Sequence, residues 1–324
     1  MIKNKKKLKS IDLFAGIGGI RVGFEAAGFE TIYANDFDKK AAETYRINFG
    51  KIDETDLFDV IKRSGMKPIP KHFDILLAGF PCQPFSMAGQ RKGFADKGRG
   101  DLLFAIIEIL KERKPRAVFL ENVKYLKHHD DEKTFKRIQS ELREAGYYMD
   151  AKVLNSMNYG NVPQTRERIY IAGFRTPRTL MKFRWPEEVP LTKTIASVLE
   201  TKVGDNFYYS DEDKFIYPKL KVAVKRKDRA YQYRRVYVRE NKNGVYPTLT
   251  ASMGLGGHNV PIVKDHKGIR KLTPRECARI QGFPESFILP SDQANTHLYK
   301  QIGNSVTVPL IGRIAEKMRI ALES

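Results

Sequence analysis

Short apolar runs alternate with stretches that have the helical spacing of apolar residues through the first 175 residues. The runs have the length of buried strands and predict strands at Ser10–Phe14, Thr31–Asn35, Phe73–Gly79, Ala117–Glu121, Tyr148–Asn155 and Ile169–Phe174. We expect one helix from Asp101 to a point before Pro115, and another from Thr134 to a C-terminal cap at Gly146. This alternation is typical of a largely parallel sheet with helices on both faces.

The pattern changes after about Trp185-Pro186, where prolines, single basic residues and short alternating stretches follow until about Asp265. Thr248-Leu249-Thr250, followed by a glycine-rich stretch, predicts a strand that leads into a flexible loop. Helical signals return at Thr273-Pro274 and from Val308 onwards. We therefore expect a large α/β domain of residues 1–186, completed by residues 297–324. A smaller, β-rich and irregular domain would comprise residues 187–296.

Composition limits the class of protein. A chain of 324 residues with 41% hydrophobic residues can form a large core, which excludes a disordered protein. The sequence has no long uncharged apolar stretch, and Asp12 and Arg21 interrupt the segment that follows the lysine-rich start. We therefore expect neither a membrane span nor export. Cys82 and Cys277 form no disulfide framework and no metal-ligand cluster, which suits a reducing cytoplasm.

The charge of the chain favours a polyanionic partner. The formal net charge is +20, and the segment from Lys214 to Lys242 holds eleven basic residues and two acidic ones. Aromatic residues such as Tyr233 and Tyr237 lie between these charges, a composition that suits contacts with phosphates, sugars or bases. The alternation across residues 235–239 fits an ordinary half-exposed strand equally well.

A glycine-rich turn, Phe14-Ala15-Gly16-Ile17-Gly18-Gly19, follows the first predicted strand. Glycines there allow the backbone to approach a ligand closely, although a tight turn without a ligand explains some such patterns. The second strand ends in Asn35-Asp36-Phe37, where a carboxylate can accept ribose hydroxyls and a ring can stack on adenine. Because Gly18 is followed directly by Gly19, the spacing favours a nucleoside cofactor without a pyrophosphate.

Cys82 lies between Pro81 and Pro84, just after the third predicted strand. Ligands of open α/β sheets bind beyond the carboxyl ends of the strands. The prolines stiffen the loop and present the cysteine, whereas a core cysteine would behave as a small hydrophobic residue. The thiolate is the nucleophilic form, and nearby cations stabilise it. The candidate cations are Arg91, Lys92, Arg166 and Arg168.

Glu121 ends the next strand and is expected at the same edge of the sheet as Cys82. It could cap the following helix, or it could hydrogen-bond a substrate ring and pass a proton to it. Gln164-Thr165-Arg166-Glu167-Arg168 could be a solvated charge run, but it directly precedes an apolar strand that should enter the core.

These elements resemble the ordered motifs of bacterial C5-cytosine DNA methyltransferases of the restriction–modification type. The resemblance covers the whole chain. The motifs that carry it are Phe14–Gly19, Gly79–Ser86, Glu121-Asn122-Val123, Gln164–Arg168, Leu272–Cys277 with Gln281-Gly282-Phe283-Pro284, and Gln301–Val306. It implies a Rossmann-like, S-adenosylmethionine-dependent methyltransferase domain and a target-recognition domain. It also implies a monomeric cytoplasmic enzyme that acts on double-stranded DNA at a short palindromic site and protects it from a cognate endonuclease.

The resemblance also implies roles for individual residues. Cys82 would attack C6 of a flipped cytosine, Glu121 would engage N3 and the amino group, and Arg166 and Arg168 would steady the pyrimidine and the catalytic loop. The cofactor residues would be Phe14, Gly16, Gly18, Asp36, Phe37, Asp56, Asn304 and Ser305. The DNA-binding residues would be Gln83, Ser86, Arg234, Arg235, Arg239, Thr248 and Leu249. No metal ion is expected.

Four alternatives fit the sequence less well. Methylation of an exocyclic amino group calls for a Pro-Pro pair in the catalytic loop, and the chain has none. The tRNA cytosine methyltransferases of the same fold carry Cys-Phe-Thr, and neither cysteine here precedes Phe-Thr. A nicotinamide oxidoreductase leaves Cys82 and the basic segment unexplained. A non-catalytic DNA-binding regulator would lack the nucleophile or the carboxylate, and both are present.

Overall fold

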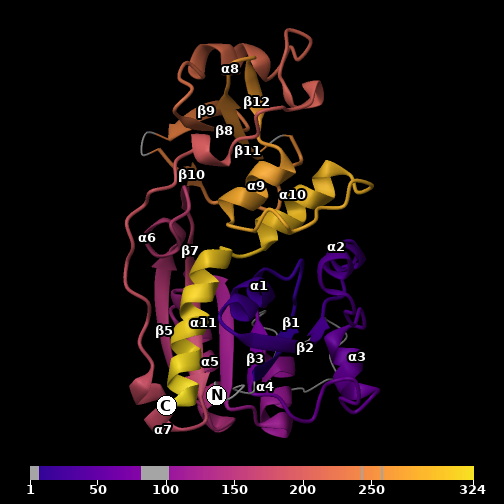
Figure 1. The fold of residues 1–324 in the computed structure, drawn as a ribbon, viewed down its shortest axis with the longest axis vertical. Coiled ribbons are helices and arrows are strands. Elements are labelled where there is room, and N and C mark those ends of the chain that lie inside the picture. Colours follow the sequence, from indigo (N-terminus) through magenta and orange to yellow (C-terminus); the bar gives the residue numbers. More distant parts are fainter. Residues whose placement is uncertain (1–6, 82–101, 242–243, 257) are drawn as a thin grey trace, which may run out of the picture. The chain divides into compact units, whose positions relative to one another are not determined.

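The computed structural model describes residues 7–81, 102–241, 244–256 and 258–324. The chain divides into two compact units. The first unit comprises Met1–Leu154, Glu167–Pro186 and Ile311–Ser324, and the second comprises Asn155–Arg166 and Glu187–Leu310. Each unit has its own hydrophobic core. Figure 1 labels the helices and strands of both units.

The first unit is built on a six-stranded sheet with the order β2-β1-β3-β4-β7-β5. Its strands are β1 (Leu8–Leu13), β2 (Phe29–Asn35), β3 (Ile75–Ala78), β4 (Ala117–Val123), β5 (Tyr148–Asn155) and β7 (Glu167–Phe174). β1 pairs in parallel with β2 and β3, and β3 pairs in parallel with β4, whereas β7 is antiparallel to β4. All six strands expected from the apolar runs are therefore present, in a mostly parallel sheet.

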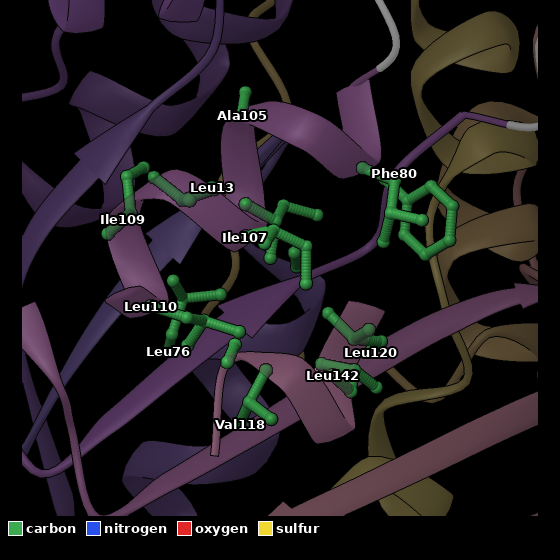
Figure 2. Packing of buried hydrophobic residues seen from close by; sticks show 14 of the residues in the cluster. Leu13, Leu76, Phe80, Ala105, Ile107, Ile109, Leu110, Val118, Leu120 and Leu142 are labelled. Atoms are coloured by element: carbon green, nitrogen blue, oxygen red, sulfur yellow. The ribbon is translucent and has the colours of Figure 1, made fainter. Parts of the chain in front are cut away.

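Helices cover both faces of this sheet. They are α1 (Gly19–Ala26), α2 (Lys39–Phe49), α3 (Leu57–Lys62), α4 (Leu102–Arg113), η2 (Lys124–Lys127), α5 (Lys133–Glu144), α7 (Pro177–Lys182) and α11 (Val308–Glu323). Val118 and Leu120 of β4 belong to a buried cluster with residues of α3, α4 and α5 (Figure 2). Phe119 faces the other way, and its ring centroid lies 5.2 Å from that of Phe24 in α1. Because side chains alternate along a strand, α1 and α4 lie on opposite faces of the sheet.

Local sequence explains where these helices begin and end. Asp38 caps α2, because its side chain accepts hydrogen bonds from the N–H groups of Lys40 and Ala41. α4 ends at Arg113, before Pro115, and the chain leaves α5 through Gly146, which has a φ of 85°. These ends agree with the expectations from the sequence.

The second unit contains an antiparallel sheet with the order β12-β11-β8-β9. Its strands are β8 (Ala230–Arg234), β9 (Tyr237–Asn241), β11 (His258–Lys264) and β12 (Ile269–Lys271), and a separate parallel pair is formed by β6 (Gln164–Thr165) and β10 (Tyr246–Pro247). Its helices are α6 (Ser156–Gly160), η3 (Ala196–Val198), η4 (Asp205–Phe207), α8 (Tyr217–Ala223), α9 (Pro274–Ile280) and α10 (Asn295–Asn304). Leu220 of α8 packs with Tyr231 and Ile262 of the sheet to form the core of this unit.

One local expectation about this unit was wrong. The strand expected at Thr248–Thr250 is absent, since β10 stops at Pro247. The N–H of Leu249 donates to the side-chain oxygen of Gln164 and not to a neighbouring strand. The half-exposed strand considered across residues 235–239 is present from Tyr237 onward as part of β9. The two residues before it form a hairpin turn, because Arg234 pairs with Tyr237 and Arg235 has a φ of 55°. The two-residue connection determines which side chains occupy the tip of the hairpin.

Candidate active site and DNA interface

Cys82, Gln83 and Ser86, together with Arg91 and Lys92, lie outside the described residues. The backbone that leads to them is well anchored. Phe80 is buried, and its carbonyl oxygen accepts a hydrogen bond of 2.9 Å from Nδ2 of Asn122. The exit of β3 is therefore tied to the end of β4, two residues before Cys82.

Glu121 and Arg168 form an ion pair at this edge of the sheet. Nε of Arg168 lies 3.3 Å from Oε1 of Glu121, and the two side chains are 14% and 11% exposed. β4 and β7 bring them together, because Val123 pairs with Arg168 in the antiparallel ladder. A Cβ atom placed on Gly79 would lie 3.7 Å from Oε2 of Glu121. The carboxylate thus lies beside the exit of β3, and Gly79 precedes Cys82 by three residues.

Asp36 organises the glycine-rich turn that follows β1. Its Oδ2 accepts a hydrogen bond of 2.7 Å from the N–H of Gly16, and its Oδ1 accepts one of 2.8 Å from the N–H of Asp38. Gly16 has a φ of 54°, a conformation that favours glycine, and a Cβ atom there would have no neighbour within 4 Å. The turn therefore borders open space next to an oriented carboxylate.

Four other residues assigned to the cofactor lie in the first unit. Phe37 is 61% exposed, so its ring is available for stacking. Gly18 precedes α1 with a φ of 84°, and a Cβ atom there would overlap the ring of Phe49. Asp56 is exposed and caps α3 by accepting a hydrogen bond from the N–H of Phe58. Phe14 also has a positive φ, of 55°.

Asp12 is a fully buried carboxyl at the end of β1, and neither of its oxygens has a hydrogen-bond partner among the described atoms. Burial raises its pKa to about 8, with Arg21 acting in the opposite direction. The oriented carboxylate of Asp36 and the open space at Gly16 fit a nucleoside cofactor. Among the described residues, no cluster of His, Cys, Asp or Glu could hold a metal ion.

Arg166 lies in the second unit, unlike Arg168, and its guanidinium hydrogen-bonds the carbonyl oxygens of Leu249, Gly303 and Ser305. Asn304 and Ser305 lie at the end of α10 in the same unit. The motif Gln164–Arg168 therefore supplies one arginine to each unit.

The residues assigned to DNA differ in exposure. Arg235 and Arg239 are exposed at the β8–β9 hairpin, and Arg234 is half-buried. Thr248 donates its hydroxyl to the carbonyl of Thr165 at 2.9 Å. Leu249 is buried, so its side chain faces the core of the unit.

Three residues without a role in the sequence analysis support these sites. Asn122 anchors the exit of β3, Gln164 bonds the backbone of Leu249, and Asp12 lies under the glycine turn. Asn122 and Gln164 belong to motifs that resemble those of the family, so their positions in the sequence could have indicated a role. The signal for Asp12 was a charged residue within an apolar strand.

Comparisons with known proteins agree on one family. A family model described as C-5 cytosine-specific DNA methylase matches residues 8–319. The Type II methyltransferase M.Bsp6I of Bacillus sp. (strain RFL6) is 51% identical over 315 residues, which cover 96% of this chain and 98% of that protein. The Type II methyltransferase M1.ScrFI of Lactococcus lactis subsp. cremoris is 41% identical over 327 residues, covering 99% and 81%.

A solved structure has the same fold. The methyltransferase EhMeth of Entamoeba histolytica aligns with a TM-score of 0.75 at 20% identity, over 99% of this chain and 100% of that one. At this identity the likeness concerns the arrangement of helices and strands.

Proposed function

The chain belongs to the C-5 cytosine-specific DNA methylases, and on this premise we propose that Cys82, Glu121 and Arg168 transfer a methyl group to C5 of a flipped cytosine in double-stranded DNA. The observation that carries the assignment is the Glu121–Arg168 pair beside the exit of β3. Glu121 lies next to Gly79, which precedes Cys82 by three residues in the sequence. A nucleophile, a carboxyl group and a cation are thereby expected at one edge of the sheet.

The chemistry explains why these groups are needed. C5 of cytosine is a weak nucleophile within an aromatic ring. The thiolate of Cys82 forms a bond to C6, and the electron pair of the C5–C6 double bond moves into the ring, where C5 gains enamine character. Glu121, when its carboxyl group is protonated, donates that proton to N3 and thereby neutralises the negative charge that develops. Arg168 holds the Glu121 carboxyl group in the orientation that this proton transfer requires.

The final step restores the aromatic ring. Once C5 carries the methyl group, loss of its proton regenerates the C5–C6 double bond, and the C6–sulfur bond breaks to release the Cys82 thiolate. The proton on N3 returns to Glu121. We assign no side chain as the base, and water can serve. The target base must leave the stack for any of these steps, at a cost of a few kcal/mol that phosphate contacts offset.

S-adenosylmethionine is the cofactor that we assign, and it supplies the methyl group when it is bound. Asp36 would accept the ribose hydroxyls, and Phe37 would stack on the adenine. Phe14, Gly16, Gly18 and Asp56 would border the nucleoside. Asn304 and Ser305 remain assigned to the cofactor on the resemblance of their motif.

The biological role that we propose is protection of host DNA from a cognate restriction endonuclease, by a monomer in the cytoplasm. The Type II methyltransferases at 51% and 41% identity support this role. No helix in the described part of the chain has the length and apolar character needed to cross a bilayer. The tRNA enzyme stays the second candidate, because the fold suits both nucleic acids.

Bisulfite sequencing tests the proposal. Plasmid DNA from cells that express the protein should contain 5-methylcytosine in one short sequence context, and plasmid from cells with an empty vector should not. Duplex DNA of that context with 5-fluorocytosine at the target should form a stable adduct at Cys82 when the donor is present. Unmodified plasmid, together with methylated tRNA from the same cells, would favour the tRNA enzyme instead.

A further inference from the structure

Arg166 is 2% exposed, and its guanidinium binds backbone oxygens of the second unit. Nη1 donates to the carbonyl of Leu249 at 2.9 Å. Nη2 donates to the carbonyls of Gly303 at 3.3 Å and Ser305 at 2.5 Å. One planar cation thus joins two segments that are far apart in the sequence. The rigid fork of a guanidinium suits this geometry, and the single ammonium of a lysine does not.

Leu249 is also held through its N–H group. The side-chain oxygen of Gln164 accepts that N–H at 2.9 Å, and Nε2 of Gln164 donates to Oε1 of Gln281 at 3.2 Å. Gln281 in turn donates to the carbonyl of Ile302 at 3.1 Å. Gln164 and Gln281 are fully buried. Both backbone polar groups of Leu249 are therefore bonded to side chains that lead to the end of α10.

Close packing reinforces these bonds. A Cβ atom on Gly303 would overlap the carbonyl group of Thr250, so the last turn of α10 lies directly against the backbone there. A Cβ atom on Gly254 would lie 2.7 Å from the ring of Tyr299, which also belongs to α10. We call residues 248–254 the recognition segment. Its start is bonded to Gln164 and Arg166, and its remainder packs on α10.

We propose that Arg166 is a positioning residue for DNA sequence recognition, which holds the recognition segment in place and does not contact the cytosine ring. This inference rests on the proposed function, which assigns Thr248 and Leu249 to the DNA interface. Because Leu249 turns its side chain inward, the segment itself must be held accurately for its neighbours to meet base edges. A shift of the segment would then reduce discrimination between sequences more than it reduces the rate of chemistry.

Arg166→Lys and Arg168→Lys form a matched pair for the test. Each variant is assayed on a duplex with the context that bisulfite sequencing identifies, and on one with a single exchanged base pair outside the target. For Arg166→Lys we expect the ratio of kcat/KM between the two duplexes to fall about tenfold, the equivalent of one good base contact. We expect its kcat to fall by a smaller factor than this ratio. Arg168→Lys should lower kcat and keep the ratio.

An unchanged ratio for Arg166→Lys overturns the inference, whether or not kcat falls. A fall in kcat as large as that in the ratio also overturns it, since Arg166 would then act on the chemistry. If Arg166→Lys lacks the thermal transition of the unaltered protein, the ratio of kcat/KM between the two duplexes is measured for Gln164→Met instead. This exchange removes the hydrogen bond to the Leu249 N–H at nearly constant side-chain volume, so the ratio should fall and an unchanged ratio overturns the inference. Failure of the proposed function is a separate result, in which the unaltered protein methylates neither duplex.

Discussion

The two cysteines of the chain differ in their sequence contexts, and the structure describes Cys277. Cys277 is fully buried in α9, and burial raises the pKa of its thiol well above the ordinary value, with the Glu276 carboxylate acting in the same direction. It therefore stays protonated and unreactive at neutral pH. Cys82 stands between two prolines just beyond β3. The covalent chemistry is accordingly assigned to Cys82.

The exchange Cys82→Ser should lower methyl transfer on the order of a thousandfold or more, because a hydroxyl is a far weaker nucleophile than a thiolate. Binding of S-adenosylmethionine, measured by calorimetry, should be unchanged. Transfer from labelled donor to duplex DNA gives the rate.

Cys277→Ser is the matched control. It places a hydroxyl in the core, so we expect a lower melting temperature and a loss of about 1–3 kcal/mol in stability, with methyl transfer retained. A fully active Cys82→Ser protein would refute the covalent scheme.

At the scale of elements, α9 illustrates how local and distant interactions converge. Thr273 and Glu276 form a capping box at its start. The same Glu276 carboxylate accepts hydrogen bonds from Nη1 of Arg270 at 2.8 Å and from Nη2 at 2.7 Å. Nε of Arg270 donates a hydrogen bond of 2.5 Å to Asp265. Arg270, at the centre of β12, is fully buried. β12 and α9 are thus joined by a buried cation between two carboxylates.

This network predicts a dependence of stability on pH. Burial alone would raise the pKa of Asp265, but hydrogen bonds from Arg270, the N–H of Gly268 and Tyr208 lower it to about 2. The folded pKa lies below the unfolded value of about 3.9. The stabilisation is therefore present above pH 4 and is lost as the pH falls toward 2.

Asp265→Asn should reduce the free energy of unfolding at pH 7 by about 1.5–3 kcal/mol, the contribution of a hydrogen bond to a charged group. It should also flatten the decline of stability between pH 4 and pH 2. Guanidinium denaturation at several pH values measures both effects. Asp211→Asn, which removes an exposed partner of Lys221, should change stability by less than about 0.5 kcal/mol. Equal effects of the two variants would contradict the assignment.

At the scale of the whole molecule, the charge of +20 favours association with DNA, and the β8–β9 hairpin concentrates exposed arginines. The turn places Arg235 at the hairpin tip in a left-handed conformation, next to the exposed Val236 and Tyr237. A projecting basic tip suits contact with a phosphate backbone.

Arg235→Ala should weaken DNA binding and reduce the slope of log K against log salt by about one, since one fewer counterion is released. Arg234→Ala should act in the same direction. Fluorescence anisotropy over a range of salt concentrations measures the slope. Arg63→Ala is the control, because Arg63 follows α3 directly and pairs with Asp59 of that helix. A slope that Arg235→Ala and Arg234→Ala leave unaltered would remove both residues from the interface.

The amino-acid pattern alone determined the six strands of the large sheet, the C-terminal ends of α4 and α5, the start of α9, and the family. Short apolar runs, prolines, glycines and capping residues act on their near neighbours in the sequence. The elements that they specify can therefore be predicted from the sequence. Glu121 could be expected near the exit of β3 for the same reason, because parallel strands end at a common edge.

Only the tertiary structure decided which residues, distant in the sequence, contact one another. Arg166 and Arg168 stand two positions apart, yet one binds backbone carbonyls of the second unit and the other pairs with Glu121. The side chain of Leu249 is buried, and Arg270 binds the carboxylates of Asp265 and Glu276. Such contacts depend on which surfaces meet after the chain has folded, and no local periodicity encodes them.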